Sequence, residues 1–385
     1  MSRIHRIPAL GLSHRGFRIK PTLNQKIHGK ARIIRHTDTN SDTIYKRENT
    51  CIITLDTDVM STYLIKLVLD YLLGPLQTPQ KLECPEILRN EVTYGKPIGS
   101  GVNAYVYTCM ILSEGDNKVY VAKDAKRGGI SSEEVDMHWI LTRSAPGLVI
   151  NMKCKVREDK FVTSIIMEKA KLALSEACLH DLESKFAQIT AFSRNVLELL
   201  HKKHEIVHGD IKADNILLVD DSDNGLRISD FGSSKKKSKA QKIPHEFVYH
   251  TADTQSGSGV LNEQDDVCGI VLVLLEIILR ITKNDEEATV DIVRRQHDTG
   301  MYYAVVDIEK CRQDLEHTQE HLTCYQDMGL KLLTYLEELH SLNGRVDCAQ
   351  FCVFLQEQCN ALELQRSSKK RKHGGWTSKE KRRKA

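Results

Sequence analysis

The sequence contains no hydrophobic run long enough to cross a membrane. Its longest apolar stretch, Val267 to Leu279, is interrupted by Gly269 and Glu276 and is shorter than the roughly 20 residues that a spanning helix needs. We interpret it as a buried core helix. The first 20 residues carry basic side chains throughout and no continuous apolar core, so we expect no secretory leader and no membrane partner.

Cysteine patterns typical of metal sites are also missing. The eleven cysteines include no CxxC pair and no His/Cys group at zinc spacing. In a chain of 385 residues they are best interpreted as reduced thiols of a cytosolic or nuclear protein. The sequence has no internal repeat, which argues against a repeat array.

Acidic residues are scarce at both ends of the chain. The formal net charge of +3 combines +8 in residues 1–50 and +9 in residues 366–385, which leaves −14 for residues 51–365. Basic ends suit acidic partners, whereas an acidic body favours basic ones.

The pattern of residues changes along the chain. Residues 1–50 are polar, basic and without sustained periodicity, which predicts a flexible extension. Residues 51–91 are predicted to form a helical segment, apolar at helical spacing from Asp56 to Leu73, and a linker, packed on the domain that follows. Residues 361–385 form a basic tail that we expect to be disordered.

Residues 92–360 are predicted to fold as one α+β domain with two lobes. Short alternating or apolar runs predict strands in residues 92–167, the β-rich N-lobe. Helical periodicity predominates in residues 168–360, the α-helical C-lobe, over the stretches 186–201, 267–279, 327–339 and 347–357. Strands followed by helices indicate a small β-rich lobe and a larger helical one.

Two glycines separated by one residue lie near the start of this domain, in the run Ile98-Gly99-Ser100-Gly101 that continues to Val106. A hairpin turn there can bring backbone N–H groups against phosphate oxygens, where a Cβ would intrude. Such hairpins are common, so the signal is weak alone. The next strand strengthens it with Val121-Ala122-Lys123, because a lysine there can neutralise the α- and β-phosphates of ATP.

A lysine in an apolar strand needs a partner to offset its desolvation. The predicted helix at 132–142 offers Glu133 and Glu134. Apolar residues surround Glu134 at helical spacing, so its neighbours can pack while it faces Lys123. We therefore favour Glu134 slightly over Glu133, against the alternative of a solvated acidic first turn.

The strongest signal lies at residues 206–232. Asp210, Lys212 and Asn215 follow His208 at fixed offsets, and a strand, a turn and a second strand lead to Asp230-Phe231-Gly232. A carboxylate such as Asp210 can orient a hydroxyl and accept its proton, and a cation such as Lys212 can stabilise a transferring phosphoryl group. Asn215 and Asp230 supply the oxygen ligands that Mg²⁺ prefers.

These motifs resemble those of the eukaryotic protein kinase superfamily over roughly residues 92–357. The resemblance implies a bilobal protein-kinase-like fold, with ATP and Mg²⁺ between the lobes and Ser/Thr hydroxyls of proteins as acceptors. It assigns catalytic roles to Asp210, Lys212, Lys123 and Glu134, and Mg²⁺ binding to Asn215 and Asp230. It assigns nucleotide binding to Ile98, Gly99, Ser100, Gly101, Val106, Ala122, Lys123, Met167, Glu168, Asn215 and Asp230. Lys212 is the serine/threonine-type choice in this family, and the hinge begins at Glu168.

The chain departs from the family pattern at informative positions. Gly209 replaces the arginine that pairs with a phosphorylated activation segment, so we expect activity without that phosphorylation. Thr254 stands where a glutamate is usual, which leaves Arg345 without its usual partner. Both features resemble the vaccinia-related kinases of the casein-kinase-1 group, and the former also the Bub kinases; a viral member is one interpretation. Ala104 replaces the third loop glycine, and the polar stretch 281–325 leaves the docking helices of the C-lobe undefined.

Five lysines follow the Asp-Phe-Gly motif, at Lys235, Lys236, Lys237, Lys239 and Lys242. A solvated charge run is one interpretation. The other is a basic rim that attracts acidic or phosphorylated substrates, which would oppose the preference expected from the acidic body.

The tail holds two basic clusters, Lys369 to Lys372 and Lys381 to Lys384. They predict recognition by a nuclear import receptor and a nuclear protein that also occurs in the cytoplasm. DNA or chromatin contact is a further alternative, to which Trp376 could contribute by stacking. Besides an active kinase, the sequence leaves open a pseudokinase scaffold and a nucleic-acid-binding protein.

Overall fold

The structure is a computed structural model that describes residues 31–35, 41–46, 53–56 and 83–381, except 102, 115–117, 221–224, 239–250, 252–254, 256–259, 297–301, 318–321 and 342–343. The chain divides into two compact units, Met1–Glu83 and Cys84–Ala385. Among the described residues, no helix combines the length and the apolar character that a membrane span requires.

The first unit contains an antiparallel sheet of β1 (Ala31–Arg35), β2 (Ser41–Lys46) and β3 (Ile53–Asp56), in that order. This differs from the expectation of a flexible segment over residues 1–50. The strands coincide with short β-branched runs such as Thr43-Ile44, which favour extended backbone. Residues 57–82, which hold most of the helix expected from Asp56 to Leu73, lie outside the described residues.

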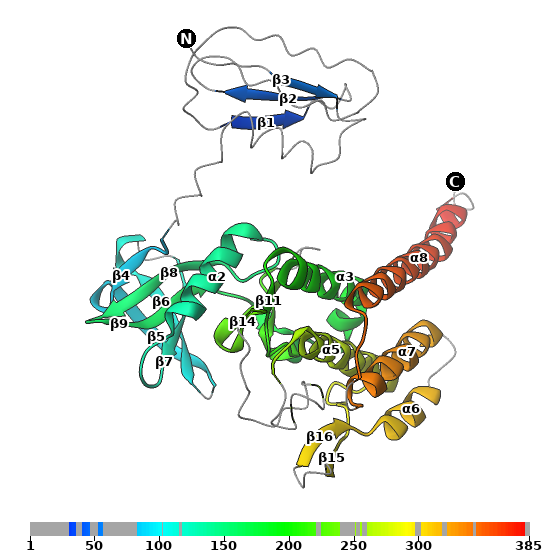
Figure 1. The fold of residues 1–385 in the computed structure, drawn as a ribbon. Helices are drawn as coiled ribbons and strands as arrows, with labels where there is room; N and C mark the ends of the chain where they lie inside the picture. Colours follow the sequence, from blue (N-terminus) through cyan, green and yellow to red (C-terminus); the bar gives the residue numbers. More distant parts are fainter. Residues whose placement is uncertain are drawn as a thin grey trace, which may run out of the picture. The chain divides into compact units, whose positions relative to one another are not determined.

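The second unit begins with a six-stranded sheet in the order β4-β8-β9-β7-β6-β5 (Figure 1). Its strands are β4 (Glu86–Leu88), β5 (Val92–Ser100), β6 (Ala104–Ile111), β7 (Tyr120–Ala125), β8 (Met152–Glu158) and β9 (Phe161–Glu168). β4 pairs parallel with β8, and the other pairs are antiparallel. The predicted β-rich N-lobe is therefore confirmed, and it includes residues 86–88, which precede the expected boundary at 92.

Helix α2 (Ser132–Ser144) packs on one face of this sheet, with Val135 against Met152 and Ile165. Its N-cap is Ser131, whose side chain accepts a hydrogen bond from the Glu134 N–H. The opposite face carries a second apolar cluster that includes Tyr120, Ala122, Cys154 and Ile166. Because side chains alternate along a strand, each strand contributes to both faces.

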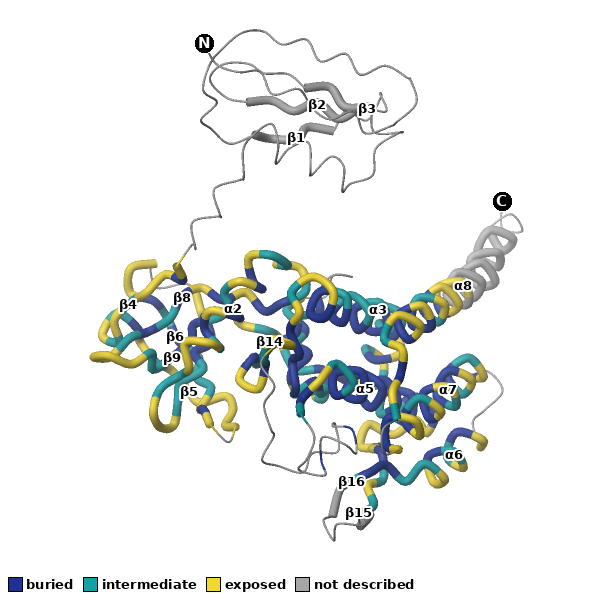
Figure 2. The backbone as a smooth tube through the Cα atoms, in the orientation of Figure 1, coloured by how far each residue is buried: buried dark blue, intermediate teal, exposed yellow. Residues whose placement is uncertain are grey.

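The C-lobe is mainly helical, built from α3 (Leu179–Leu197), α5 (Glu263–Lys283), α6 (Ile308–Glu316), α7 (Thr323–Leu339) and α8 (Cys348–Lys381). Helix α5 is the most deeply buried of these (Figure 2), as its apolar run predicts. It starts at the N-cap Asn262 and ends at Asn284, whose left-handed backbone closes the helix.

Short sheets surround this core. β10 (Leu172–Ala173) pairs with β12 (Ile216–Leu218), which pairs with β13 (Leu226–Ile228). β11 (Ile206–Val207) pairs with β14 (Lys235–Lys236), and β15 (Ile292–Gln296) with β16 (Tyr302–Val306). The stretch 281–325, whose polar sequence leaves its elements undefined, thus contains a hairpin and helix α6.

Helix α8 continues through the basic tail as far as Lys381. The expectation of a tail without regular structure over residues 361–385 is corrected in this respect. The segment contains no proline, and its lysines, arginines and glutamates are good helix formers.

Candidate functional site

Three charged groups meet where α2, β7 and the Asp-Phe-Gly turn come together. Lys123 Nζ on β7 lies 2.6 Å from Glu134 Oε1 and 2.7 Å from Asp230 Oδ1. The structure thus brings Lys123 to Glu134, as the sequence predicted, rather than to Glu133, whose carboxylate is 3.5 Å from Lys235. Gly232 lies against this group, since an added Cβ would lie 3.2 Å from Asp230 Oδ1 and 3.4 Å from Lys123 Nζ.

The electrostatics of this group keep Lys123 and Asp230 charged. Burial lowers the pKa of Lys123, but Asp230 and Glu134 outweigh it, so its pKa lies above the ordinary value. Burial likewise raises the pKa of Asp230, and the charge and hydrogen bond of Lys123 outweigh it, so its pKa lies below the ordinary range. The result is an ionised carboxylate available to a cation.

The loop between β11 and β12 carries a second group. Lys212 Nζ lies 2.8 Å from Asp210 Oδ2, and the Asn215 amide donates to Asp210 Oδ2 at 3.0 Å and to its carbonyl oxygen at 2.7 Å. A short 3-10 turn, Ala213–Asn215, sets the spacing of these side chains. Asn215 is nearly buried, whereas Asp210 and Lys212 are partly exposed, so a hydroxyl can reach the carboxylate.

A buried carboxylate of α5 holds this loop in place. Asp266 accepts hydrogen bonds at 2.8 Å from the backbone N–H groups of His208 and Gly209 and from His201 Nε2. Burial lowers the pKa of His201, but its bond to Asp266 outweighs that effect and raises the pKa to about 9. Asp266 is not among the site residues predicted from the sequence; its position directly before the apolar run Val267 to Leu279 was the available signal.

Gly209 adopts a backbone that favours glycine, with φ of +76°. An added Cβ would lie 2.5 Å from Leu261 Cδ2. The family carries an arginine at position 209. The Leu261 side chain fills the space that the Cβ of such a residue would enter. Thr254 lies outside the described residues, and Arg345 is exposed.

The glycine-rich run forms the end of β5 and the turn to β6. The Gly101 N–H donates to the Ala104 carbonyl at 2.9 Å, and the register shifts twice between Tyr94 and Gly99. A Cβ on Gly99 would meet its nearest protein atom at 3.6 Å and one on Gly101 at 4.0 Å. A Cβ at either position would make only ordinary van der Waals contact with the protein, so no protein atom requires these glycines, whereas close approach of a ligand to the backbone would. Ile98 is 53% exposed at the edge of this region.

The prediction for Ala122 needs correction. Ala122 is fully buried in the cluster with Tyr120 and Ile166, on the sheet face opposite to Lys123. The alternation places Val121 on the face of Lys123, where it pairs with Met167 of β9. Val106 pairs with Lys123 in the register of β6 and β7 and so shares that face. The error came from adjacency in sequence, because neighbouring strand residues point in opposite directions.

Met167 and Glu168 end β9, where the chain passes to the C-lobe. The Glu168 N–H donates to the Asn151 carbonyl at 2.9 Å, and Glu168 Oε1 accepts from the Asn151 N–H at 2.8 Å. Glu168 therefore binds Asn151, the residue before β8, through both backbone and side chain. This contact fixes the start of the connection between the lobes.

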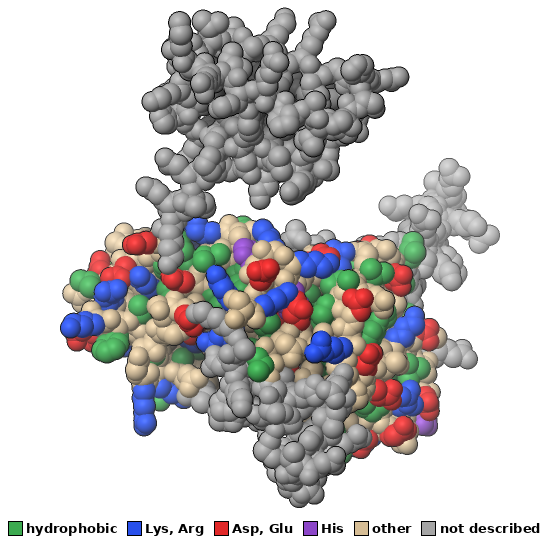
Figure 3. Space-filling model, in the orientation of Figure 1, with side chains coloured by type: hydrophobic (Ala, Val, Ile, Leu, Met, Phe, Trp, Pro, Cys, Tyr) green, Lys and Arg blue, Asp and Glu red, His purple; other side chains and the backbone are tan. Residues whose placement is uncertain are grey.

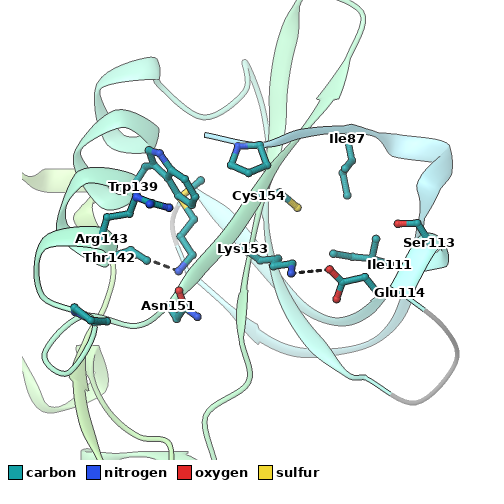
Figure 4. A pocket seen from close by; sticks show the side chains of 13 residues that line it. Ile87, Ile111, Ser113, Glu114, Trp139, Thr142, Arg143, Asn151, Lys153 and Cys154 are labelled. Carbon is teal, nitrogen blue, oxygen red and sulfur yellow. Dashed lines mark hydrogen bonds and ion pairs between the residues drawn. The ribbon is translucent and has the colours of Figure 1, made fainter. Parts of the chain in front are cut away.

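A hollow of about 570 Å³ lies elsewhere, behind α2 (Figure 4). Trp139, Thr142 and Arg143 of α2 line one side of it, and Lys153 points away from them to Glu114, with Lys153 Nζ 2.6 Å from Glu114 Oε1. None of its lining residues belongs to the two charged groups described above. The chemistry therefore lies outside this hollow.

Comparisons with known proteins agree with this arrangement. Residues 92–332 match the protein kinase domain family. A G-type lectin S-receptor-like serine/threonine-protein kinase of Arabidopsis thaliana is 32% identical over 28% of this chain and 14% of its own length. A probable receptor-like serine/threonine-protein kinase of that plant is 25% identical over 49% of this chain and 34% of its own length.

Among solved structures, the Cydia pomonella granulovirus kinase PK-1 is similar at 19% identity and a TM-score of 0.45, over 65% of this chain and 90% of that one. The chain spans about a third or less of the length of the curated plant relatives. The family match covers more than half of the chain and contains both charged groups. The chain belongs to the protein kinase domain family.

Proposed function

We propose that the protein is an ATP-dependent serine/threonine protein kinase. The observation that carries the proposal is that Lys123 Nζ contacts the carboxylates of both Glu134 and Asp230, at 2.6 and 2.7 Å. A loop that presents Asp210 and Lys212 accompanies this group. In this proposal Asp210 orients the acceptor hydroxyl and takes its proton. Lys212 stabilises charge on the transferring group.

The donor set fits Mg²⁺ and a nucleotide triphosphate. Asn215 and Asp230 offer oxygen ligands, and the lowered pKa of Asp230 keeps its carboxylate ionised. Bound Mg²⁺ would neutralise phosphate charge. Gly99, Ser100 and Gly101 would present backbone N–H groups to the phosphates, and Lys123 would pair with them. Ile98, Val106, Val121, Met167 and Glu168 would surround the base.

Transfer of labelled phosphate from Mg-ATP to basic and acidic test proteins checks this function. We expect phosphoserine or phosphothreonine in the products, and Asp210→Asn should lower transfer by at least about 100-fold because the proton acceptor is lost. A wild-type protein that binds ATP but transfers nothing would favour the pseudokinase scaffold instead.

We also propose activity without phosphorylation of the activation segment. Gly209 removes the phosphate-binding arginine, and the Leu261 side chain supplies an apolar contact at that place. Lys235 and Lys237 make internal ion pairs with Glu133 and Glu263, so part of the lysine run holds the segment to the domain. Phosphatase treatment should leave the initial rate unchanged; a large loss would contradict this proposal.

The substrate preference is open between basic and acidic proteins. On the face drawn in Figure 3, acidic and basic side chains of the described residues are interspersed. Gly209 and Thr254 support a position near the vaccinia-related kinases, with a viral member as one alternative. A phylogeny built on the matched domain would test that position.

The basic clusters at 369–372 and 381–384 support nuclear import, with DNA or chromatin contact as a second role. A fluorescent fusion should accumulate in the nucleus, with a remaining cytoplasmic fraction, and lose that accumulation when residues 366–385 are removed. Salt-dependent DNA retention that survives this removal would favour a nucleic-acid-binding function of the body.

A further inference from the structure

Two side chains of α2 bind the same backbone carbonyl. His138 Nε2 lies 2.9 Å from the Ile150 oxygen, and Thr142 Oγ1, one turn further, donates to it at 3.2 Å. Thr142 Oγ1 also accepts from the Met152 N–H at 3.1 Å. His138 and Thr142 are 2% and 5% exposed, so water does not compete for these bonds. We call this group, His138, Thr142 and residues 150–152, the α2 clasp.

The carbonyl determines the state of His138. A carbonyl oxygen only accepts hydrogen bonds, so Nε2 must carry a proton. Burial lowers the pKa of His138 to about 4, and the ring is therefore neutral at pH 7 with its proton on Nε2. His138 Nε2–H therefore donates a hydrogen bond between two neutral groups to the Ile150 carbonyl oxygen.

The Ile150 peptide is bound to the C-lobe on its other side. Its N–H donates to the Ile228 carbonyl at 2.9 Å, and the Ile228 N–H donates to the Leu148 carbonyl at 2.8 Å. Ile228 ends β13, two residues before Asp230. One residue, Ile150, therefore joins α2 through its carbonyl to the strand that leads to Asp230 through its N–H.

The His138 ring adds a second connection to the same region. Its centroid lies 5.1 Å from that of Phe231, which lies 5.1 Å from that of His208. His208 Nε2 lies 3.0 Å from the Ser229 carbonyl and donates to it, and Phe231 is 1% exposed. Rings from α2, from the turn after β13 and from the catalytic loop are therefore in contact.

Glu134 lies one helical turn before His138, so its position depends on the register of α2. The apolar contact of Val135 with Met152 and Ile165 keeps α2 near the sheet but is not directional. Hydrogen bonds are directional and can fix rotation and sliding of the helix. We propose that His138 and Thr142 are positioning residues, which hold Glu134 against Lys123 by anchoring α2 to Ile150. The catalytic consequence rests on the proposed kinase function.

A matched pair of variants isolates the hydroxyl of Thr142. Thr142→Val keeps the shape and removes the hydroxyl, whereas Thr142→Ser keeps it. Each is made alone and together with Glu134→Gln, and the Mg-ATP affinity, kcat and KM of every variant are measured. We expect Thr142→Val to lower kcat/KM about 3- to 10-fold, the worth of one or two hydrogen bonds, and Thr142→Ser to remain within about twofold.

The expected sign of a positioning role is non-additivity. In the Glu134→Gln background the loss from Thr142→Val should shrink to less than about twofold, because the group being positioned is already altered. Amide exchange at Met152 should accelerate in Thr142→Val and not in Thr142→Ser. If Thr142→Val does not fold, His138→Leu is tested in its place, alone and together with Glu134→Gln.

Equal losses in both backgrounds, or an unchanged Thr142→Val, would overturn the proposal and leave the clasp a merely structural contact. Absence of phosphate transfer by the wild type would instead contradict the proposed function. The Mg-ATP affinity cycle would still decide the role of the clasp in that case.

Discussion

The Leu261 side chain lies against Gly209, in the space that any Cβ at that position would enter. Two constraints therefore act on one residue: a left-handed backbone and a filled neighbouring volume. They explain why an arginine is not simply interchangeable with glycine here, and they make the glycine testable.

Gly209→Ala should lower the free energy of unfolding by about 1–3 kcal/mol, from the positive φ and from displacement of Leu261. Urea denaturation measures this. The double variant Gly209→Ala/Leu261→Ala serves as the control, because it relieves the contact but not the backbone strain. A Gly209→Ala protein as stable as wild type would contradict the strained geometry.

The ion pair of His201 with Asp266 should make stability depend on alkaline pH. The pKa of His201 is raised to about 9, whereas its unfolded value is about 6.5, so the stabilisation is fully present below pH 6.5 and is lost as pH rises through 9. The loss should reach up to about 3 kcal/mol. Chemical denaturation from pH 6 to pH 9.5 would measure it.

His201→Gln provides the comparison for this pH dependence. This variant should be less stable at pH 6, because Asp266 keeps a buried charge without its cationic partner. It should also lack the decline between pH 6.5 and 9. A decline as steep as that of the wild type would assign the effect to other groups.

Arg89, which precedes the matched family domain, should stabilise the N-lobe. Its guanidinium donates to both carboxylate oxygens of Asp124 at 3.0 and 3.3 Å and lies 4.9 Å above the ring of Tyr94. Asp124 also accepts a hydrogen bond from the buried Ser164. Because Arg89 is partly exposed and solvent screens it, Arg89→Ala should cost only about 1–2 kcal/mol.

A matched surface pair gives the control for Arg89. Lys202 and Glu198 form an exposed i,i+4 pair at 3.6 Å, and Lys202→Ala should cost less than about 0.5 kcal/mol. Both variants are compared by thermal and urea unfolding. Equal losses of unfolding free energy in the two variants would show that the contacts of Arg89 stabilise the protein no more than a surface ion pair does.

Val121 and Ala122 should respond differently to enlargement. Val121→Phe enters the face of Lys123 and should weaken Mg-ATP binding by about tenfold or more, with a smaller effect on stability. Ala122→Val overpacks the cluster on the opposite face and should cost about 1–3 kcal/mol of stability. Nucleotide titration and urea unfolding of both variants separate the outcomes; a reversed pattern would contradict the strand register.

The sequence alone determined the chemistry of the site, since Lys123, Asp210, Lys212, Asn215 and Asp230 lie in motifs whose spacing is set by short strands and turns. It also predicted the two-lobed α+β architecture and the pairing of Lys123 with Glu134, because binary patterns and the desolvation of a buried lysine are local properties. Local patterns were less reliable at the ends of the chain, where residues 31–56 contain strands and α8 extends to Lys381.

Only the tertiary structure decided which face of the sheet each strand residue occupies. Val121, and not Ala122 as expected from the sequence, shares the face of Lys123. It also revealed the contact of Asp266 with the loop between β11 and β12, Leu261 beside Gly209, and the shared Ile150 carbonyl that joins His138 and Thr142. The partners in these contacts are separated by 8 to 58 residues along the chain. Such contacts arise from packing and from the need to satisfy buried polar groups, which no short stretch of sequence encodes.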